Sequence, residues 1–169
     1  MVVSGVVGLF EGIMAQLTII VSFQSLILDM AGNVGTQSLA VTIRVLMDET
    51  LTGRQKLELV CKEGRIGLLN GLILGAASCG VVGLYIMLFK AKTAAFAFGI
   101  SGCIGVALLL AMAVSSIVGT CVPLLFKKLG VDPAVASGPL ITTLNDLTAV
   151  VAYYGLAWLL LINTFGFGA

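Results

Sequence analysis

Asp146 is the only charged residue in the stretch 133–163, which otherwise has the apolar composition of a membrane helix. A carboxylate inside the hydrocarbon layer is costly, so such a residue normally faces a partner, an ion or water instead of lipid. No lysine or arginine lies in any apolar stretch of the chain to pair with Asp146. This residue is therefore the first candidate for a functional site.

Three further positions share the helix face of Asp146. Pro139, Thr142 and Thr143 precede it in the sequence at spacings that place all four on one side of a helix. A helix that begins at Pro133 carries Asp146 roughly 20 Å along its axis, and one that restarts at Pro139 carries it roughly 10 Å. Both distances place the carboxylate inside the hydrocarbon layer, so we expect this face to line water.

A second polar stripe is formed by Asp29, Asn33 and Gln37, which recur every four residues and so share a helix face. Gly32 and Gly35 flank Asn33, and we expect the helix to unwind there and to free backbone carbonyls along a cavity. Carbonyls, an amide and a carboxylate are ligands for a hard cation. Two other roles stay open: Asn33 and Gln37 could hydrogen-bond between helices, and Asp29 could be solvated near the outer interface.

The ligand chemistry favours Mg²⁺. The chain has no histidine and its four cysteines form no C-x-x-C pair, so a zinc or copper site is not expected. Few carboxylates among many neutral oxygens suit Mg²⁺, which keeps several waters and is held by one or two carboxylates. A single bundle of this size leaves little room for a hydrated pore. Asp146 and its mate across a two-fold axis would supply two negative charges, so we expect a homodimer.

The composition indicates a membrane protein. Of the 169 residues, 59% are apolar and only 10% are charged, and the mean hydropathy is +1.15. A typical soluble domain carries about 25% charged residues. The net charge of +1 offers no basic surface for nucleic acid, and no P-loop is present to hydrolyse ATP. We expect a protein that contacts lipid and a cation, not an enzyme.

The predicted architecture is an all-α integral membrane bundle of five segments. They cover residues 1–10, 12–43, 66–89, 93–126 and 133–162. The first is about 15 Å long as a helix, too short to cross a hydrocarbon core of about 30 Å. The second and fourth are long enough that they must tilt, bend or protrude, and a kink is expected at Pro123. Gly67, Gly71 and Gly75 predict close helix packing.

The basic residues predict the orientation. The loop between the second and third segments holds five lysines and arginines, the loop between the fourth and fifth holds two, and the remaining loop holds two. Cytoplasmic loops carry the excess of positive charge. We therefore expect a multi-pass protein of the plasma membrane with its N-terminus in the cytoplasm and its C-terminus outside.

Several stretches resemble the signature of the MgtE-type magnesium transporters, in an order and spacing that hold over nearly the whole chain. They are Phe10-Glu11, Ala31-Gly32-Asn33-Val34-Gly35-Thr36-Gln37-Ser38, Thr42-Ile43-Arg44, Val118-Gly119, Pro123-Leu124-Leu125, Leu129-Gly130-Val131-Asp132-Pro133-Ala134, and Ser137, Pro139, Leu140, Thr143, Leu144 and Asp146.

The resemblance implies a homodimer of five-helix protomers whose ion path follows the dimer interface, with residues 1–169 as the transmembrane cation-transport domain. It makes Asp146 the central Mg²⁺-binding acid. Gly32, Asn33 and Thr142 would complete the hydrated-ion site, and Asp29 would lie one turn outward in the same entrance. Mn²⁺, Co²⁺ and Ca²⁺ are further candidate ions.

Three positions depart from the family pattern. Ala31 replaces a usual glycine, and Gly138 and Ser116 replace common asparagines, which bears on affinity and ion preference but not on the location of the site. The resemblance covers the membrane domain only. We therefore expect the cytoplasmic N-domain and the paired cystathionine-synthase-type domains of many relatives to be absent. Gating by intracellular Mg²⁺ through those domains is then not expected either.

The sequence thus predicts a channel or transporter that passes Mg²⁺ down its electrochemical gradient. A secondary exchanger coupled to Na⁺ or H⁺ is an open alternative. An intramembrane aspartyl protease using Asp29 and Asp146 would need a G-x-G-D setting that neither residue has. A non-transporting scaffold subunit would show no dependence of its stability on divalent cations.

Overall fold

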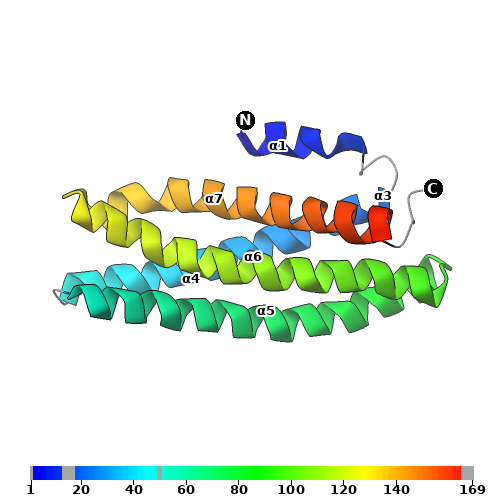
Figure 1. The fold of residues 1–169 in the computed structure, drawn as a ribbon, viewed down its shortest axis with the longest axis horizontal. Helices are drawn as coiled ribbons and strands as arrows, with labels where there is room; N and C mark the ends of the chain where they lie inside the picture. Colours follow the sequence, from blue (N-terminus) through cyan, green and yellow to red (C-terminus); the bar gives the residue numbers. More distant parts are fainter. Residues whose placement is uncertain (1, 13–17, 49–50, 165–169) are drawn as a thin grey trace.

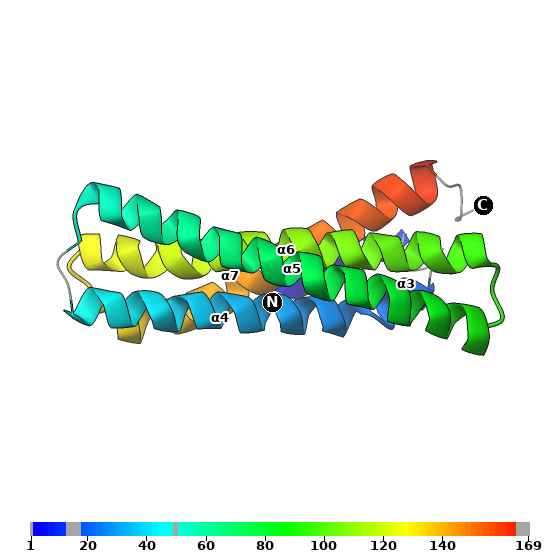
Figure 2. The ribbon, with the colours of Figure 1, turned by 90° about the horizontal axis from the view of Figure 1, so that it is seen from below.

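The computed structural model describes residues 2–12, 18–48 and 51–164, and this part of the chain is helical without any strand. In chain order the elements are α1 (Val2–Leu9), α3 (Thr18–Val21), α4 (Gln24–Asp48), α5 (Gly53–Phe89), α6 (Ala94–Lys128), α7 (Pro133–Leu156) and the π-helical segment η1 (Ala157–Thr164). The long helices α4 to α7 lie side by side with their axes roughly along one direction (Figure 1, Figure 2).

The outer surface of the bundle is apolar in a way that suits lipid. Large apolar side chains of α5 face outward, with Leu69, Ile73 and Val81 being 58%, 67% and 70% exposed. Soluble proteins rarely expose contiguous apolar patches of this kind. The described stretches long and apolar enough to cross a membrane are Thr18–Met47, Gly53–Phe89, Ala94–Lys128 and Gly138–Leu161.

These features agree with an all-α, multi-pass membrane protein. Helix α1 has eight residues, about 12 Å of helix, which is too short to span a bilayer core. It lies alongside α7 (Figure 1). The count of five segments and the homodimer stay predictions.

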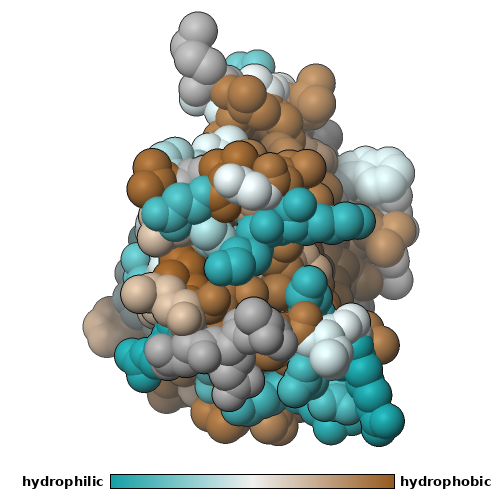
Figure 3. Space-filling model, turned by 90° about the vertical axis from the view of Figure 1, so that its left-hand side faces the viewer, coloured by the Kyte–Doolittle hydropathy of each residue, from teal (hydrophilic) through white to brown (hydrophobic). Residues whose placement is uncertain are grey.

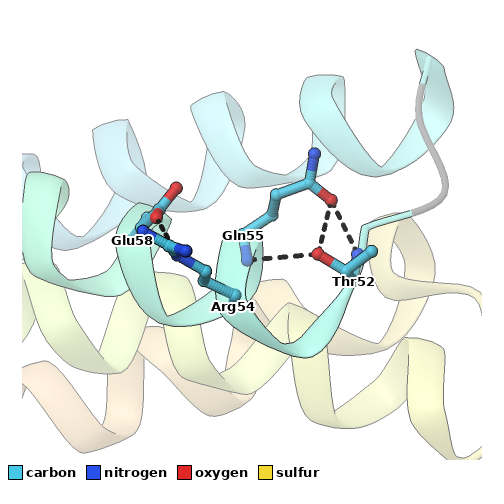
Figure 4. Close-up of polar contacts among 4 residues, drawn as sticks. All are labelled: Thr52, Arg54, Gln55 and Glu58. Carbon is cyan, nitrogen blue, oxygen red and sulfur yellow. Dashed lines mark hydrogen bonds and ion pairs between the residues drawn. The ribbon is translucent and has the colours of Figure 1, made fainter.

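Helix α5 begins well before the apolar segment that was predicted from residue 66. It starts at Gly53 and has 37 residues, roughly 55 Å of helix, so its first turns extend beyond the hydrocarbon core. Thr52 caps this end: its hydroxyl accepts a hydrogen bond from the Gln55 backbone N–H at 3.4 Å, and its own N–H donates to Gln55 Oε1 at 2.8 Å (Figure 4). Arg54 and Glu58 form an exposed ion pair across the first two turns of the helix.

Most of the basic residues expected in a loop therefore lie on this helical extension. The end of the bundle where α4 finishes and α5 begins shows many hydrophilic side chains among the apolar ones (Figure 3). Lys127, at the end of α6, donates a hydrogen bond to the Leu46 carbonyl at 3.4 Å and so ties α6 to α4 at this same end. The basic residues therefore lie on the protruding ends of helices and not in a long loop.

Glycines bring α5 and α6 into backbone contact, as their spacing predicts. A Cβ atom added to Gly71 would lie 2.8 Å from Leu109 Cα, and one added to Gly75 would lie 2.6 Å from the Gly105 carbonyl oxygen. A Cβ on Gly67 would lie 2.7 Å from the Met112 carbonyl oxygen. Real side chains do not fit at these distances, so the close approach of the two helices requires glycine here.

The expected unwinding of residues 32–35 is wrong, because α4 is helical without interruption from Gln24 to Asp48. Two carbonyls of this turn also accept hydrogen bonds from Thr36 Oγ1, the Gly32 oxygen at 2.9 Å and the Asn33 oxygen at 3.0 Å. Gly35 is fully enclosed by neighbouring helices. Its lack of a side chain is used for close packing instead of for a break in the helix.

Helix α7 begins where its sequence predicts. Asp132 Oδ1 accepts a hydrogen bond from the Ala134 backbone N–H at 2.9 Å, and Pro133 occupies the first turn, a position where its missing N–H costs nothing. The helix continues through Pro139 without restarting. Likewise, α6 continues through Pro123.

Two tyrosines anchor the other end of α7 inside the bundle. Tyr153 Oη donates to the Ile20 carbonyl at 2.9 Å, and Tyr154 Oη donates to Gln24 Oε1 at 2.7 Å. Phe10 stacks on the Tyr154 ring with 5.6 Å between centroids. Both tyrosines are buried. Tyr153 ties α7 to α3, and Tyr154 ties α7 to the start of α4, the helix that carries the other half of the candidate site.

Candidate cation site

All five predicted site residues line one groove between α4 and α7. Asp29, Gly32 and Asn33 come from α4, and Thr142 and Asp146 come from α7. The groove has a volume of about 470 Å³, and Ser25, Leu28 and Thr36 complete its lining. Helical spacing alone predicted two polar stripes, and the fold brings Asp29 and Asn33 of one stripe and Thr142 and Asp146 of the other onto the same groove.

The α4 side of this cation groove carries a carboxylate that is linked to an amide. Asn33 Nδ2 donates to Asp29 Oδ2 at 3.4 Å, one helical turn away, and both side chains are exposed to the groove. The pair presents the second carboxylate oxygen and the amide oxygen of Asn33 to a ligand. Both are hard oxygen donors of the kind that bind Mg²⁺ or its waters.

The α7 side carries a carboxylate that no described side chain neutralises. Asp146 is partly exposed in the groove, and the described residues offer it no hydrogen bond or ion pair. Thr142, one turn earlier, donates its hydroxyl hydrogen to the Gly138 carbonyl at 3.1 Å, so its oxygen lone pairs remain available. A lone carboxylate at this depth in a membrane helix attracts a cation.

Three helices meet directly behind the groove and fix the register of α7 on α4. The side-chain amide of Asn145 occupies the space where a Cβ atom of Gly35 would lie, and a Cβ atom of Gly119 would overlap the Gly35 carbonyl oxygen. Asn145 directly precedes Asp146 in the chain. The packing of Asn145 against α4 therefore sets the direction of the Asp146 side chain. The sequence reasoning missed Asn145, although an amide beside Asp146 in an apolar stretch was a usable signal.

Asn145 is completely buried, and neither atom of its amide has a hydrogen-bond partner among the residues that the structure describes. A buried amide without partners is destabilising by about 1–3 kcal/mol. An alanine or leucine would avoid this penalty. The asparagine is therefore costly for the fold, which is common beside functional sites.

Gln37, the third residue of the predicted α4 stripe, does not reach the cation groove. It lines an adjoining groove between α4 and α5 together with Asn70 of α5. Thr36 and Ser25, which sequence reasoning did not single out as ligands, do line the cation groove. Thr36 lies seven residues after Asp29 and Ser25 lies four residues before it, so helical spacing would have placed both on the same helix face as Asp29.

The donor set fits a hydrated divalent cation. In the described part of the chain no three His, Cys, Asp or Glu side chains cluster closely enough to cage a metal ion. Six waters occupy roughly 180 Å³ at about 30 Å³ each, and the groove of about 470 Å³ accommodates that shell. Two carboxylates and several neutral oxygens can then hold the ion through its waters.

Comparison with known proteins agrees with this chemistry. A family model described as "MgtE: Divalent cation transporter" matches residues 24–156. The chain is 38% identical over 148 residues to the magnesium transporter MgtE of Enterococcus faecalis, covering 88% of this chain and 31% of that protein. It is 34% identical over 152 residues to the Bacillus subtilis magnesium transporter MgtE, covering 90% and 32%.

The magnesium transporter MgtE of Thermus thermophilus is 34% identical over 164 residues, covering 95% of this chain and 34% of that protein. The chain thus spans about a third of the length of these relatives. The members of this family are transporters, so the aspartyl protease alternative is set aside. Because the matched residues 24–156 include both helices of the cation groove, the chain belongs to the MgtE family of divalent cation transporters.

Proposed function

We propose that this chain carries Mg²⁺ across a membrane and that the cation groove between α4 and α7 is its ion-binding site. The observation that supports this most directly is the convergence of Asp29, Asn33, Thr142 and Asp146 on one groove at membrane depth. Residues 1–169 act as the transmembrane cation-transport domain. Mn²⁺, Co²⁺ and Ca²⁺ are candidates for the same site.

The ion enters as a hydrated cation. Mg²⁺ sheds its waters reluctantly, so the protein gains by contacting those waters instead of replacing them. Asp146 supplies the main negative charge, and Asp29 supplies a second one at the outer side of the groove. The oxygens of Asn33 and Thr142 accept hydrogen bonds from metal-bound water, and Gly32 keeps space for the hydration shell because it has no side chain.

Two copies of the chain complete the path. The cation groove is open on one side, with Asp29, Asn33 and Thr142 exposed, and exposed polar side chains at membrane depth are costly against lipid. A two-fold axis through the open side would place two grooves opposite each other. It would enclose the ion between two Asp146 carboxylates, whose combined charge matches one divalent cation.

The orientation follows from the basic extension of α5. Its lysines and arginines, with Lys127 and Lys128, place the end shown in Figure 3 in the cytoplasm by the positive-inside rule. Asp29 then lies toward the outside of Asn33. The start of α4 and the C-terminus are then outside, and the plasma membrane is the proposed location. Helix α1 leads to the outer end (Figure 1) and is too short to cross the bilayer core, so the cytoplasmic N-terminus expected from five spanning segments is not part of this proposal.

Mg²⁺ uptake into proteoliposomes tests the proposal. We expect Asp146→Asn, which keeps the shape of the side chain and removes its charge, to lower uptake at least about 100-fold while the protein stays folded. Asp132→Asn is the matched control, since asparagine also caps helices well and Asp132 lies outside the groove. Parental uptake by the Asp146→Asn protein would reject the proposed function.

A further inference from the structure

A second polar groove adjoins the cation groove and lies between α4 and α5. It has a volume of about 600 Å³, and its polar lining consists of Asn33, Thr36, Gln37 and Asn70. We call it the amide groove. Asn33 and Thr36 line the cation groove as well, so the two grooves share one edge of α4.

Asn70 places an amide without a partner in the apolar part of α5. It lies four residues after Ile66, roughly 6 Å into the apolar stretch 66–89, and it is the only amide in that stretch. It is partly buried, and the described residues offer its side chain no hydrogen bond. An unpaired amide in hydrocarbon is destabilising, so this position favours water or a hydrated ligand in the amide groove.

A buried carboxylate lies outside the lining of the amide groove, two helical turns before Asn70 on α5. Ser38, which follows Gln37 in α4, donates its hydroxyl hydrogen to Glu63 Oε2 at 3.0 Å. Glu63 is only 3% exposed, and within the described chain the one ion pair joins Arg54 to Glu58, so no cation neutralises Glu63. It precedes Asn70 by two helical turns on the same face of α5, roughly 10 Å away.

The amide groove combines four polar side chains with an apolar lining of Met30, Val34, Leu74 and Met112. Glu63 is the nearest buried carboxylate along α5, and its negative charge favours a cation toward this end of the groove. The cavity of about 600 Å³ accommodates the roughly 180 Å³ of six waters. Amide oxygens accept hydrogen bonds from metal-bound water.

We infer that the amide groove is a second subsite for the hydrated divalent cation, on the cytoplasmic side of the Asp146 site. Gln37 and Asn70 contact the waters of the ion, and Glu63 contributes charge without direct contact. Asn33 and Thr36, shared by both grooves, let the ion pass from one subsite to the next along α4. This inference rests on the proposed function and extends its path inward.

Two variants of the chain test the subsite in opposite directions. Asn70→Leu combined with Gln37→Leu removes both amides, and we expect Mg²⁺ uptake to fall about tenfold because two hydrogen bonds to the hydration shell are lost. Asn70→Asp adds a carboxylate, and we expect it to raise the number of Mn²⁺ ions bound per chain, counted by the loss of the free-ion signal in electron paramagnetic resonance. Ser78→Ala, on the same helix and outside the groove, is the control.

The added Mn²⁺ site also tests the role of Glu63. We expect Glu63→Gln to weaken Mn²⁺ binding in the Asn70→Asp background about tenfold through the lost charge. Glu58→Gln is the matched control, because Glu58 is exposed and paired with Arg54. In the background of Asp146→Asn, the Asn70→Asp protein is expected to keep its added Mn²⁺ ion, which separates the two subsites.

The outcomes distinguish this inference from the proposed function. If Asp146→Asn abolishes Mg²⁺ uptake but the double leucine variant transports normally, the amide groove is not on the path and only the second subsite is rejected. An Asn70→Asp protein that binds no additional Mn²⁺, with a double leucine variant that loses thermal stability together with uptake, would show that the amides pack helices. Normal uptake by Asp146→Asn would reject the proposed function itself.

Discussion

At the scale of single residues, Gly32 and Gly35 lie one turn apart on α4 and serve opposite purposes. A Cβ atom on Gly32 would meet nothing within 4 Å, whereas one on Gly35 would overlap the Asn145 amide. We expect Gly35→Ala to destabilise the protein by about 1–3 kcal/mol, the usual effect of overpacking, as measured by thermal unfolding in detergent. Gly102→Ala is the control, since its Cβ atom has free space and alanine favours helix by about 0.5–1 kcal/mol. Equal stability of the two variants would contradict the close packing of Asn145 on Gly35.

The residues of the candidate site were predictable because helical periodicity states which side chains share a face. Asp29 and Asn33 are hydrogen-bonded at the predicted spacing, and Thr142 and Asp146 line the same groove. Periodicity does not state which neighbouring helix a face meets. For this reason Gln37, predicted in the same stripe as Asp29, lies in the amide groove instead. The contact between Asn145 and Gly35 could likewise be found only from the structure. Mg²⁺ binding by these residues stays a prediction.

At the scale of helices, α5 and α6 form the tightest pair because glycines remove the side chains between them. We expect Gly71→Ala to destabilise the protein by about 1–3 kcal/mol, because its Cβ atom would lie 2.8 Å from Leu109 Cα, and backbone cannot move aside as a side chain can. Gly80→Ala on the same helix meets nothing within 4 Å and is the matched control. Thermal unfolding monitored by circular dichroism compares the two. A Gly71→Ala protein as stable as the Gly80→Ala protein would show that the helices can separate without loss.

The spanning helices were predictable from apolar segments, and their ends were not. Hydropathy marks the part of a helix inside the bilayer, whereas α5 continues for several turns into a charged extension that is stabilised by its own cap at Thr52. The prediction of a helix break at residues 32–35 is wrong for a related reason. Glycine in a membrane helix permits either unwinding or close packing, and only the contacts of Gly35 with α6 and α7 decide for packing.

At the scale of the whole molecule, the native Cys61 reports the orientation. It is exposed on the basic extension of α5, outside the apolar part of that helix. We expect a membrane-impermeant maleimide to label Cys61 in inside-out vesicles and not in intact cells, because the positive-inside rule places this extension in the cytoplasm. Cys61→Ser identifies the labelled site, since it should abolish the reaction while the other three cysteines remain. Labelling of Cys61 from outside would reverse the proposed topology.

The driving force for transport is also a property of the whole assembly. If the path is a channel, a divalent cation crossing the bilayer gains about 2.3 kcal/mol per charge for each 100 mV, or about 4.6 kcal/mol in total. We therefore expect a potassium diffusion potential, inside negative, to accelerate Mg²⁺ uptake into proteoliposomes without any Na⁺ or pH gradient. An exchanger would instead stop when the coupling ion is removed, whatever the potential. Empty liposomes and the Asp146→Asn protein control for leakage. Uptake that requires a Na⁺ or H⁺ gradient would contradict the channel mechanism and favour the exchanger.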